Sequence, residues 1–464
     1  MGKGALRGAW PGNDGQTNIQ LILPLLILLS VLVLFAMIIP TLSATKTIAL
    51  AAGLVIFILC FVSTEIGLYV LILSMLLSPE FIVGSTAGAS MGRGVTLRLD
   101  DFILVIIGFS WLAKMAINKD LGLFLRTPLN KPIAFYIVIC LVSTLLGSLF
   151  GRVHLKTGFF FVLKYFEYII VFFMVVNHIR DKSQARRYLW AMLFTCVLVS
   201  IIGIAQIPGG GRVSAPFEGE IGEPNTFGGY LVFMISLVTG LLITTRVLRD
   251  KFIYLSLLIL FAVPLLYTQS RSSYVAAIPA LLMFVFLSEK KHWIILGILV
   301  VAFTLPFFAP RVTKERVKYT FTQGLKRKDV VKVGGVKLDT STSARLISWR
   351  DAISDSIKHP LLGFGVTGYR FVDAQYIRVI AETGVMGLLT FLLLMHAIFK
   401  QGWVSYQASK EPLEKGLSTG FLAGLIGLLF HAFGANTFII VRIMEPFWFT
   451  AALVTMLPRL PEKA

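Results

Sequence analysis

The sequence has few charged residues and few cysteines, and each shortage excludes a class of protein. Charged side chains make up 14% of the 464 residues, well below the roughly 25% of an ordinary soluble domain, and the mean hydropathy is +0.82. A soluble enzyme and a disordered chain are therefore excluded. The three cysteines lie inside apolar runs without CxxC spacing, so we expect neither a disulfide scaffold nor a cysteine-ligated metal site. The remaining class is an integral membrane protein.

Apolar runs recur along the chain at lengths that suit membrane spans. A helix needs about 20 residues to cross the hydrocarbon core of a bilayer, and a window of about 19 residues predicts about fourteen spans. The second and third spans are short, so the count is 12 to 14 and the fold class is an all-α polytopic membrane protein. The first run is longer than the apolar part of a signal peptide, and we expect it to be retained. The expected spans are residues 19–42, 46–62, 64–78, 101–117, 132–150, 157–177, 187–207, 224–245, 252–268, 271–288, 292–308, 375–399, 416–436 and 441–458.

The distribution of Lys and Arg predicts the orientation of these spans. With the N-terminus (1–18) in the cytoplasm, each inner loop beyond the tight turn after the second span is basic, as the positive-inside rule requires. The same count places spans one to eleven within 19–308 and spans twelve to fourteen within 375–458. It leaves one large loop, 309–371, on the outer face, and returns the C-terminus (459–464) to the cytoplasm.

The large outer loop is itself basic. It carries thirteen Lys and Arg against five Asp and Glu, a net charge of +8 in a chain whose total is +19. Long loops escape the positive-inside rule, so this charge does not contradict the orientation. It suits either a solvated segment that faces anionic lipids or a platform for an anionic substrate.

Single arginines also stand beside spans on the expected outer side. Any one of them is as well explained by snorkelling to lipid head groups. Several on one face indicate anion binding, because a guanidinium fork holds phosphate bidentately and loses less hydration than an ammonium group. These arginines are Arg93, Arg98, Arg152, Arg212, Arg271 and Arg442.

Two stretches place polar residues where helices are expected to begin. In Arg212–Tyr230 an arginine and a polar loop precede Pro224 and Asn225, at the start of a span that carries a pair of glycines. In Thr268–Tyr274, Ser270 and Arg271 open another span, whose N-terminal amides and dipole would add to anion binding.

A third stretch, Ser341–Gly387, runs from the outer loop into the next span. Ser343 is expected to cap a helix that ends at His359-Pro360, and Gly363 and Gly365 then form a turn. We interpret His359 mainly as a residue that positions this loop.

In this order the motifs resemble those of the O-antigen ligase and polymerase superfamily, membrane glycosyltransferases that join lipid-diphosphate-linked glycans. The resemblance covers roughly residues 212–387. It rests on an Arg with Pro-Asn before a glycine-bearing span, Ser-Arg opening a later span, an Arg-x(3)-Trp helix, His-Pro-Leu-x-Gly-x-Gly and Glu-x-Gly-x-x-Gly. It implies a GT-C-like fold with one large periplasmic loop, located in the bacterial inner membrane with its active site facing the periplasm.

One position distinguishes the branches of this superfamily. Its ligases, which transfer the glycan to lipid A core, carry a His followed by Asn, Ser or Gln eleven residues before the first glycine of the Glu-x-Gly element. Asp373 and Ala374 stand there, and the stretch is similar to the Asp-x-x-Tyr form of polymerase-like members, with Ala374 in the place of their usual Asn. The resemblance therefore favours a Wzy-type polymerase that joins undecaprenyl-diphosphate-linked repeat units into O-antigen or a related polysaccharide, with the ligase as the alternative.

The reaction that this resemblance implies is an inverting glycosyl transfer. A sugar hydroxyl attacks the anomeric carbon of a second lipid-linked glycan, and polyprenyl diphosphate leaves. Fixed cations stabilise such a leaving group, a role that we assign to Arg212, Arg271 and Arg345, with Arg98 and Arg442 as further diphosphate contacts. With these arginines present we expect neither a metal nor a cofactor.

The attacking hydroxyl needs a base or an orienting acceptor. The carboxylates at motif positions on the outer side are Asp373, Glu223 and Glu382. Asp373 is the first choice because it takes the place of the ligase histidine, and a helix N-cap is its competing interpretation. His431 and Asn436, in the thirteenth span, are interpreted as interhelical contacts.

The remaining expectations concern the membrane interior and the partners. Lys164 and Glu167 lie three residues apart in the sixth span and predict a structural ion pair. A lipid-linked glycan flippase is the less favoured alternative, because few charges lie near the expected midplane and no inverted repeat is visible. Expected partners are undecaprenyl-diphosphate-linked glycans, membrane lipids and a chain-length regulator, but no nucleic acid.

Overall fold

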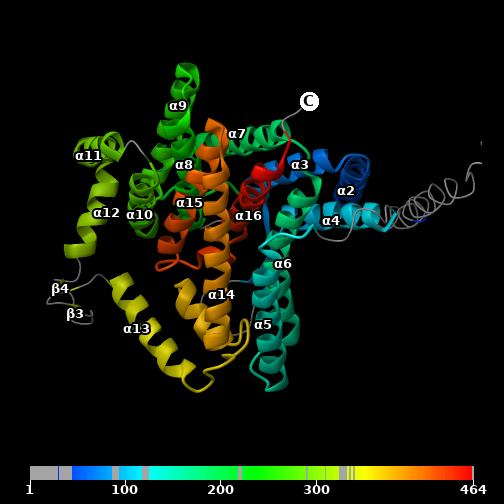
Figure 1. Ribbon diagram of the computed structural model, residues 1–464. Coiled ribbons are helices and arrows are strands. Elements are labelled where there is room, and N and C mark those ends of the chain that lie inside the picture. The colour runs from blue at the N-terminus through cyan, green and yellow to red at the C-terminus, as the bar shows by residue number, and fades with distance from the viewer. Residues whose placement is uncertain are drawn as a thin grey trace, which may run out of the picture. The chain divides into compact units, whose positions relative to one another are not determined.

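The structure, a computed structural model, is mainly helical (Figure 1). It describes residue 30 and residues 44–85, 94–117, 125–217, 222–288, 291–308, 310–322, 332–333, 336–337 and 340–461. The first expected span, 19–42, lies outside the described residues apart from Ser30. Every other expected span is a helix, which confirms the helical prediction for these segments.

The helix bounds follow the apolar runs closely. The first group is α2 (Ala44–Val62), α3 (Thr64–Leu77), α4 (Leu99–Ile117), α5 (Asn130–Leu149), α6 (Leu155–His178), α7 (Lys182–Gln206), α8 (Pro224–Thr244), α9 (Leu248–Tyr267), α10 (Arg271–Leu287) and α11 (Lys291–Phe308). The second group is α12 (Arg311–Thr322), α13 (Thr340–Ser356), α14 (Gln375–Ala408), α15 (Pro412–His431) and α16 (Val441–Met456). Short 3₁₀ turns follow α7 (η3, Ile207–Gly209), precede α16 (η5, Thr437–Ile439) and follow α16 (η6, Leu457–Arg459).

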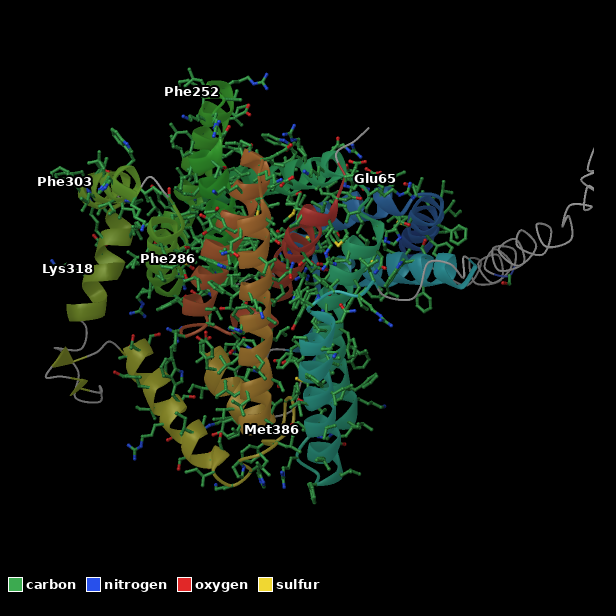
Figure 2. The ribbon with its side chains drawn as sticks, in the orientation of Figure 1. Glu65, Phe252, Phe286, Phe303, Lys318 and Met386 are labelled. Atoms are coloured by element: carbon green, nitrogen blue, oxygen red, sulfur yellow. The ribbon has the colours of Figure 1, made fainter. Side chains whose placement is uncertain are left out.

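Within the described residues, 7 helices are long and apolar enough to cross a membrane. These are α5, α6, α7 with η3, α8, α9, α14 and α15, and shorter apolar helices include α3 and α10. Phe252, Phe286 and Phe303 are 62%, 66% and 73% exposed and lie on the outer surfaces of α9, α10 and α11 (Figure 2), as lipid-facing side chains do. The polytopic membrane class is thereby confirmed, while the count of fourteen spans remains a prediction.

The chain divides into two compact units. One comprises residues 1–64 and 106–123, and its described part holds α2 and the C-terminal part of α4. There Gly53 lies close to the Ile106 side chain. The other comprises residues 65–105 and 124–464, and it contains all the candidate site residues.

The larger unit is built around α8 and α15, which are mostly buried. A Cβ atom at Gly240 of α8 would lie 2.3 Å from the carbonyl oxygen of Gly416 and 2.5 Å from the nitrogen of Gly420 on α15. The two backbones approach this closely only because the residues at the crossing have no side chains. α10 and α14 pack against α15, and α9, α10 and α16 pack against α8.

The long helix α14 is interrupted at Gly384, whose φ and ψ are 67° and −167°. The turn after α13 docks at this interruption, where the Val385 nitrogen donates to the Pro360 carbonyl oxygen at 2.8 Å. The Gly365 nitrogen donates to the Glu382 carbonyl oxygen, also at 2.8 Å. The end of the predicted outer loop is thus attached to the start of α14.

The strands are short and form two hairpins among the described residues. β1 (Glu80–Ser85) pairs antiparallel with β2 (Gly94–Arg98), and β3 (Lys332–Val333) pairs antiparallel with β4 (Val336–Lys337). The described part of the predicted outer loop, 309–371, therefore contains two helices, α12 and α13, with the second pair of strands between them. Its position relative to a membrane remains a prediction.

Candidate functional site

The N-terminus of α10 is a polar corner within an apolar helix bundle. Ser270 is its N-cap, and the Ser270 side chain accepts a hydrogen bond from the Ser273 nitrogen. Gln269, just before the cap, has a positive φ of 51°, a conformation that costs free energy in a residue with a side chain. Backbone strain of this kind clusters at functional sites, and the N-terminus of a helix favours a bound anion through its dipole.

Arg212 lies against this corner from the loop before α8. Its Nε donates to the Thr268 carbonyl oxygen at 3.0 Å and its Nη2 to the Gln269 carbonyl oxygen at 3.4 Å. The same Nη2 lies 3.5 Å from Oδ1 of Asn225, in the first turn of α8. The structure therefore brings together Arg212, Asn225, Ser270 and Arg271, which the sequence had placed in two separate stretches.

A chain of hydroxyl groups connects this corner to His431 at the end of α15. Ser270 Oγ donates to Asn225 Oδ1 at 2.9 Å, and Ser273 Oγ donates to Ser270 Oγ at 2.8 Å. Nε2 of the fully buried His431 lies 3.2 Å from Ser273 Oγ and 3.3 Å from Ser272 Oγ. Because the Ser273 hydrogen is already donated, the contact from His431 to Ser273 requires Nε2 to be the donor.

The other side of His431 faces the turn between α15 and α16. Nδ1 lies 2.8 Å from Thr437 Oγ1. With Nε2 protonated, Nδ1 accepts this hydrogen bond, which fixes one neutral tautomer. The interpretation of His431 as an interhelical contact is confirmed, because Ser272 and Ser273 belong to α10. That these contacts join two motif regions was not predicted, since nothing in an apolar span signals it.

Asp373 lies in the turn before α14, and Arg345 of α13 binds it. Nε and Nη2 of Arg345 donate to Asp373 Oδ2 at 3.1 and 2.7 Å. The two side chains are 27% and 31% exposed, so a ligand can reach them. The N-cap of α14 is Ala374, so the interpretation of Asp373 as the N-cap is wrong.

The turn that carries Asp373 is attached to the segment that follows His431. Asn436 Nδ2 donates to the Val372 carbonyl oxygen at 2.8 Å, and the Gln375 nitrogen donates to the Ala432 carbonyl oxygen at 2.9 Å. The Arg345–Asp373 pair and the corner at α10 are thus two parts of one polar region.

The other two candidate bases have different surroundings. Glu223 precedes α8, and its Oε2 accepts from Thr226 Oγ1 at 3.0 Å, close to Asn225 in sequence. Glu382 is 5% exposed, and its Oε1 accepts from Arg378 Nε at 3.1 Å and from the Thr367 nitrogen at 3.2 Å. Glu382 therefore holds the turn before α14 in place.

The loop-positioning residues form that turn. A Cβ at Gly363, where φ is +65°, would lie 2.6 Å from the Ala381 carbonyl oxygen, and Gly365 has a φ of +94°. The His359 carbonyl accepts from the Gly363 nitrogen at 2.9 Å, and the imidazole ring of His359 packs edge-on against the Phe364 ring. Desolvation, with the nearby positive charges of Arg152 and Lys358, lowers the pKa of His359.

Arg98 and Arg442 are held inside the protein. They are 4% and 1% exposed. Arg98 forms an ion pair with Asp100, and Arg442 donates to the backbone carbonyls of Leu76, Ser78, Pro216 and Phe217 at 2.7 to 3.2 Å. Because these guanidinium groups are buried and, unlike the exposed Arg212, are not accessible to a ligand, we do not retain them among the diphosphate contacts.

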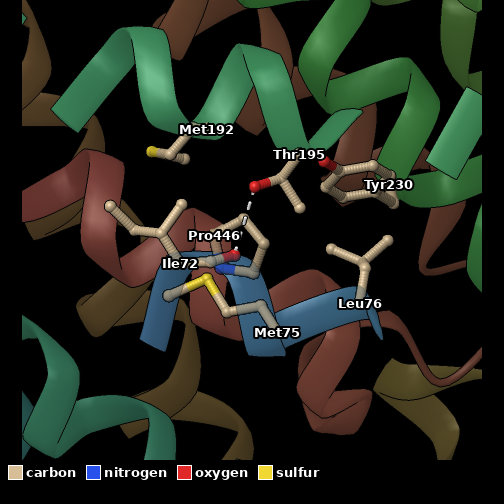
Figure 3. Close-up of a pocket in the computed structure, with 7 residues that line it drawn as sticks. All are labelled: Ile72, Met75, Leu76, Met192, Thr195, Tyr230 and Pro446. Atoms are coloured by element: carbon tan, nitrogen blue, oxygen red, sulfur yellow. Dashed lines mark hydrogen bonds between the residues drawn. The ribbon is translucent and has the colours of Figure 1, made fainter. Parts of the chain in front are cut away.

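Two cavities lie elsewhere in the larger unit. Figure 3 shows the first, which is lined mainly by apolar side chains, including Ile72, Met192 and Tyr230, and has a volume of about 10 Å³. That is room for about one water molecule, so it is a packing defect. The second is a shallow cleft of about 350 Å³ on α13, lined by Ala344, Ile347, Ser348, Asp351 and Arg370. It lies on the helix that carries Arg345.

Comparison with known families agrees with the resemblance seen in the sequence. Residues 255–392 match the family model described as O-antigen ligase, and this range includes α10, α13 and the start of α14. The members of this family are membrane enzymes that transfer glycans. No curated protein matches the chain. The expected resemblance to the O-antigen ligase and polymerase superfamily is thus confirmed.

Proposed function

We propose that this membrane protein, whose residues 255–392 match the O-antigen ligase family, polymerises glycan repeat units that are linked to a polyprenyl diphosphate. The observation that carries the proposal is one polar region that joins two kinds of group. Arg212, Arg271 and the N-terminus of α10 supply positive charge and backbone amides. The Arg345–Asp373 pair, on the other side of His431, supplies a carboxylate.

The positive part of the region suits the diphosphate of the donor. In glycosyl transfer, the bond between the anomeric carbon and the diphosphate oxygen breaks, and the electron pair leaves with the diphosphate. Charge therefore develops on the leaving group, and donors fixed in advance stabilise it without reorganising. In our proposal Arg212 and Arg271 bind the phosphate oxygens, and the dipole of α10 adds to the attraction.

The carboxylate part suits the hydroxyl of the acceptor. Both hydrogen bonds from Arg345 go to Oδ2 of Asp373, so Oδ1 can accept a hydrogen bond from the attacking hydroxyl. As the new C–O bond forms, the hydroxyl proton passes to Asp373. Arg345 thus has a different role from the one expected, because it orients Asp373 instead of binding the diphosphate.

A ligase activity is the second candidate, and the name of the matched family, O-antigen ligase, favours it. The presence of Asp373 where ligases have a histidine favours the polymerase. The location that we propose for either activity is the bacterial inner membrane, with the region of Arg212 and Asp373 on its periplasmic face.

Reconstitution into proteoliposomes with undecaprenyl-diphosphate-linked repeat units tests the proposal. A polymerase lengthens the glycan and releases undecaprenyl diphosphate without a further acceptor. A ligase forms a product only when lipid A core is added. Movement of the lipid-linked glycan across the bilayer with no new glycosidic linkage would contradict both.

A further inference from the structure

A cluster of charged side chains lies buried in the larger unit, apart from the polar region just described. The residues of this cluster come from the end of β2, the start of α4, α6 and α16. Its carboxyl groups are Asp100, Asp101, Glu167 and Glu445, and its cations are Arg98, Lys164 and Arg442.

Two of the carboxylates each bind a cation directly, although Asp101 Oδ1 has no hydrogen-bond partner among the described residues. Asp100 forms an ion pair with Arg98 and accepts from Ser78 Oγ at 3.1 Å. Asp101 Oδ2 accepts from Lys164 Nζ at 2.5 Å and from the Arg98 nitrogen at 3.0 Å. The charges of Arg98 and Lys164 are thus balanced by Asp100 and Asp101.

Glu445 and Glu167 are left with weak contacts. Glu445 is 0% exposed, and among the described residues neither of its oxygens has a hydrogen-bond partner. Its nearest cation is Arg98, with Nη2 3.6 Å from Oε2. Glu167 Oε2 lies 3.6 Å from Lys164 Nζ, which is already bound to Asp101, and Glu167 Oε1 has no hydrogen-bond partner in the described part of the chain.

The third cation, Arg442, directs its guanidinium group to four backbone carbonyls. Even if its charge is counted, four carboxyl groups face three cations. Burying an ionised carboxylate without hydrogen bonds is costly, and such a group takes up a proton instead.

We infer that Glu445 and Glu167 form a proton-binding site that holds at least one proton at neutral pH. The other titratable and charged groups that face Glu445 are Arg98, Asp101, Lys164 and Glu167. A bound metal ion is a poorer fit, because among the described residues no three His, Cys, Asp or Glu side chains are close enough to hold one. The ion pair expected between Lys164 and Glu167 is confirmed at 3.6 Å, and it is part of a larger cluster.

Infrared spectroscopy of the purified full-length protein tests this inference without relying on its activity. At pH 7 the wild type is expected to show the C=O stretching band of a protonated carboxylic acid. The double variant Glu167→Gln/Glu445→Gln is expected to lose it, and since a glutamine closely matches a neutral glutamic acid in shape, the variant should stay folded. Glu414→Gln is the matched control, because Glu414 is buried but paired with Lys182 at 2.7 Å, and the band should persist in it.

Two results would overturn the inference. One is a wild-type spectrum at pH 7 without the band, which would mean that both glutamates are ionised or bind a cation. The other is a band of equal intensity in the wild type and the double variant, which would place the protonated acid elsewhere.

Discussion

Arg345 binds Asp373 through two hydrogen bonds to one carboxylate oxygen, at 3.1 and 2.7 Å. The pair joins α13, in the predicted outer loop, to the turn that begins α14. Asp351 of α13 and Arg370 of the segment before α14 form a second pair, at 2.8 Å, and are more exposed. The two pairs therefore allow a role in the reaction to be separated from a role in holding the loop.

Asp373→Asn is expected to lower kcat by about 10²–10⁴-fold, the usual contribution of a positioned base. The asparagine keeps the size of the side chain but cannot take the proton. Asp351→Asn is the matched control, and it should leave kcat within about threefold, because exposed ion pairs contribute little. Polymer formation from lipid-linked repeat units is the measurement, and equal rates for both variants would exclude Asp373 as the base.

Arg212→Ala and Arg271→Ala are each expected to lower kcat about 10²–10³-fold, as the removal of one donor to a developing negative charge does. Arg249→Ala is the control, because Arg249 is 83% exposed and lies on α9, away from this region. The release of undecaprenyl diphosphate measures the effect. Near-normal release by both site variants would refute their role in binding the diphosphate.

His431→Phe is expected to destabilise the fold by about 1–3 kcal/mol, because Ser273 and Thr437 lose a buried partner. It should also lower kcat, since the corner at α10 and the turn of Asp373 are no longer joined. His431→Gln can still donate near the position of Nε2 and should recover part of the activity. Thermal unfolding and turnover are measured together, and equal activity for the two variants would show that the hydroxyl chain does not position the site.

Gly384→Ala is expected to destabilise the protein by about 1–3 kcal/mol from backbone strain alone, because φ is +67° at this position. A Cβ there would also lie 2.4 Å from the Leu361 backbone, so the turn of Gly363 and Gly365 would have to move. Gly297→Ala in α11 is the control, since a Cβ there meets nothing within 4 Å. Thermal unfolding in detergent measures both, and an unchanged midpoint for Gly384→Ala would contradict the strained geometry.

The helices were predictable from the sequence because their positions follow apolar runs. Ser270 and Asn225 were also predictable as residues at helix starts, since turn and cap preferences are local. The roles of Arg98 and Arg442 were not, because a sequence does not show whether an arginine at the edge of a span faces lipid, ligand or backbone carbonyls. His431 was predicted as an interhelical contact, but its partners were not, since they come from α10 and from the turn before α16.

The central claim is that Asp373 and the arginines at α10 act on one glycosyl transfer. Its most direct test counts new glycosidic linkages and released undecaprenyl diphosphate in the same proteoliposomes. The wild type is expected to give one diphosphate for each linkage. Asp373→Asn and Arg271→Ala are each expected to lose both products together. Asp373→Asn should still bind the lipid-linked donor, and Arg271→Ala should bind it with lower affinity. Linkages formed at the wild-type rate by both variants would contradict the account.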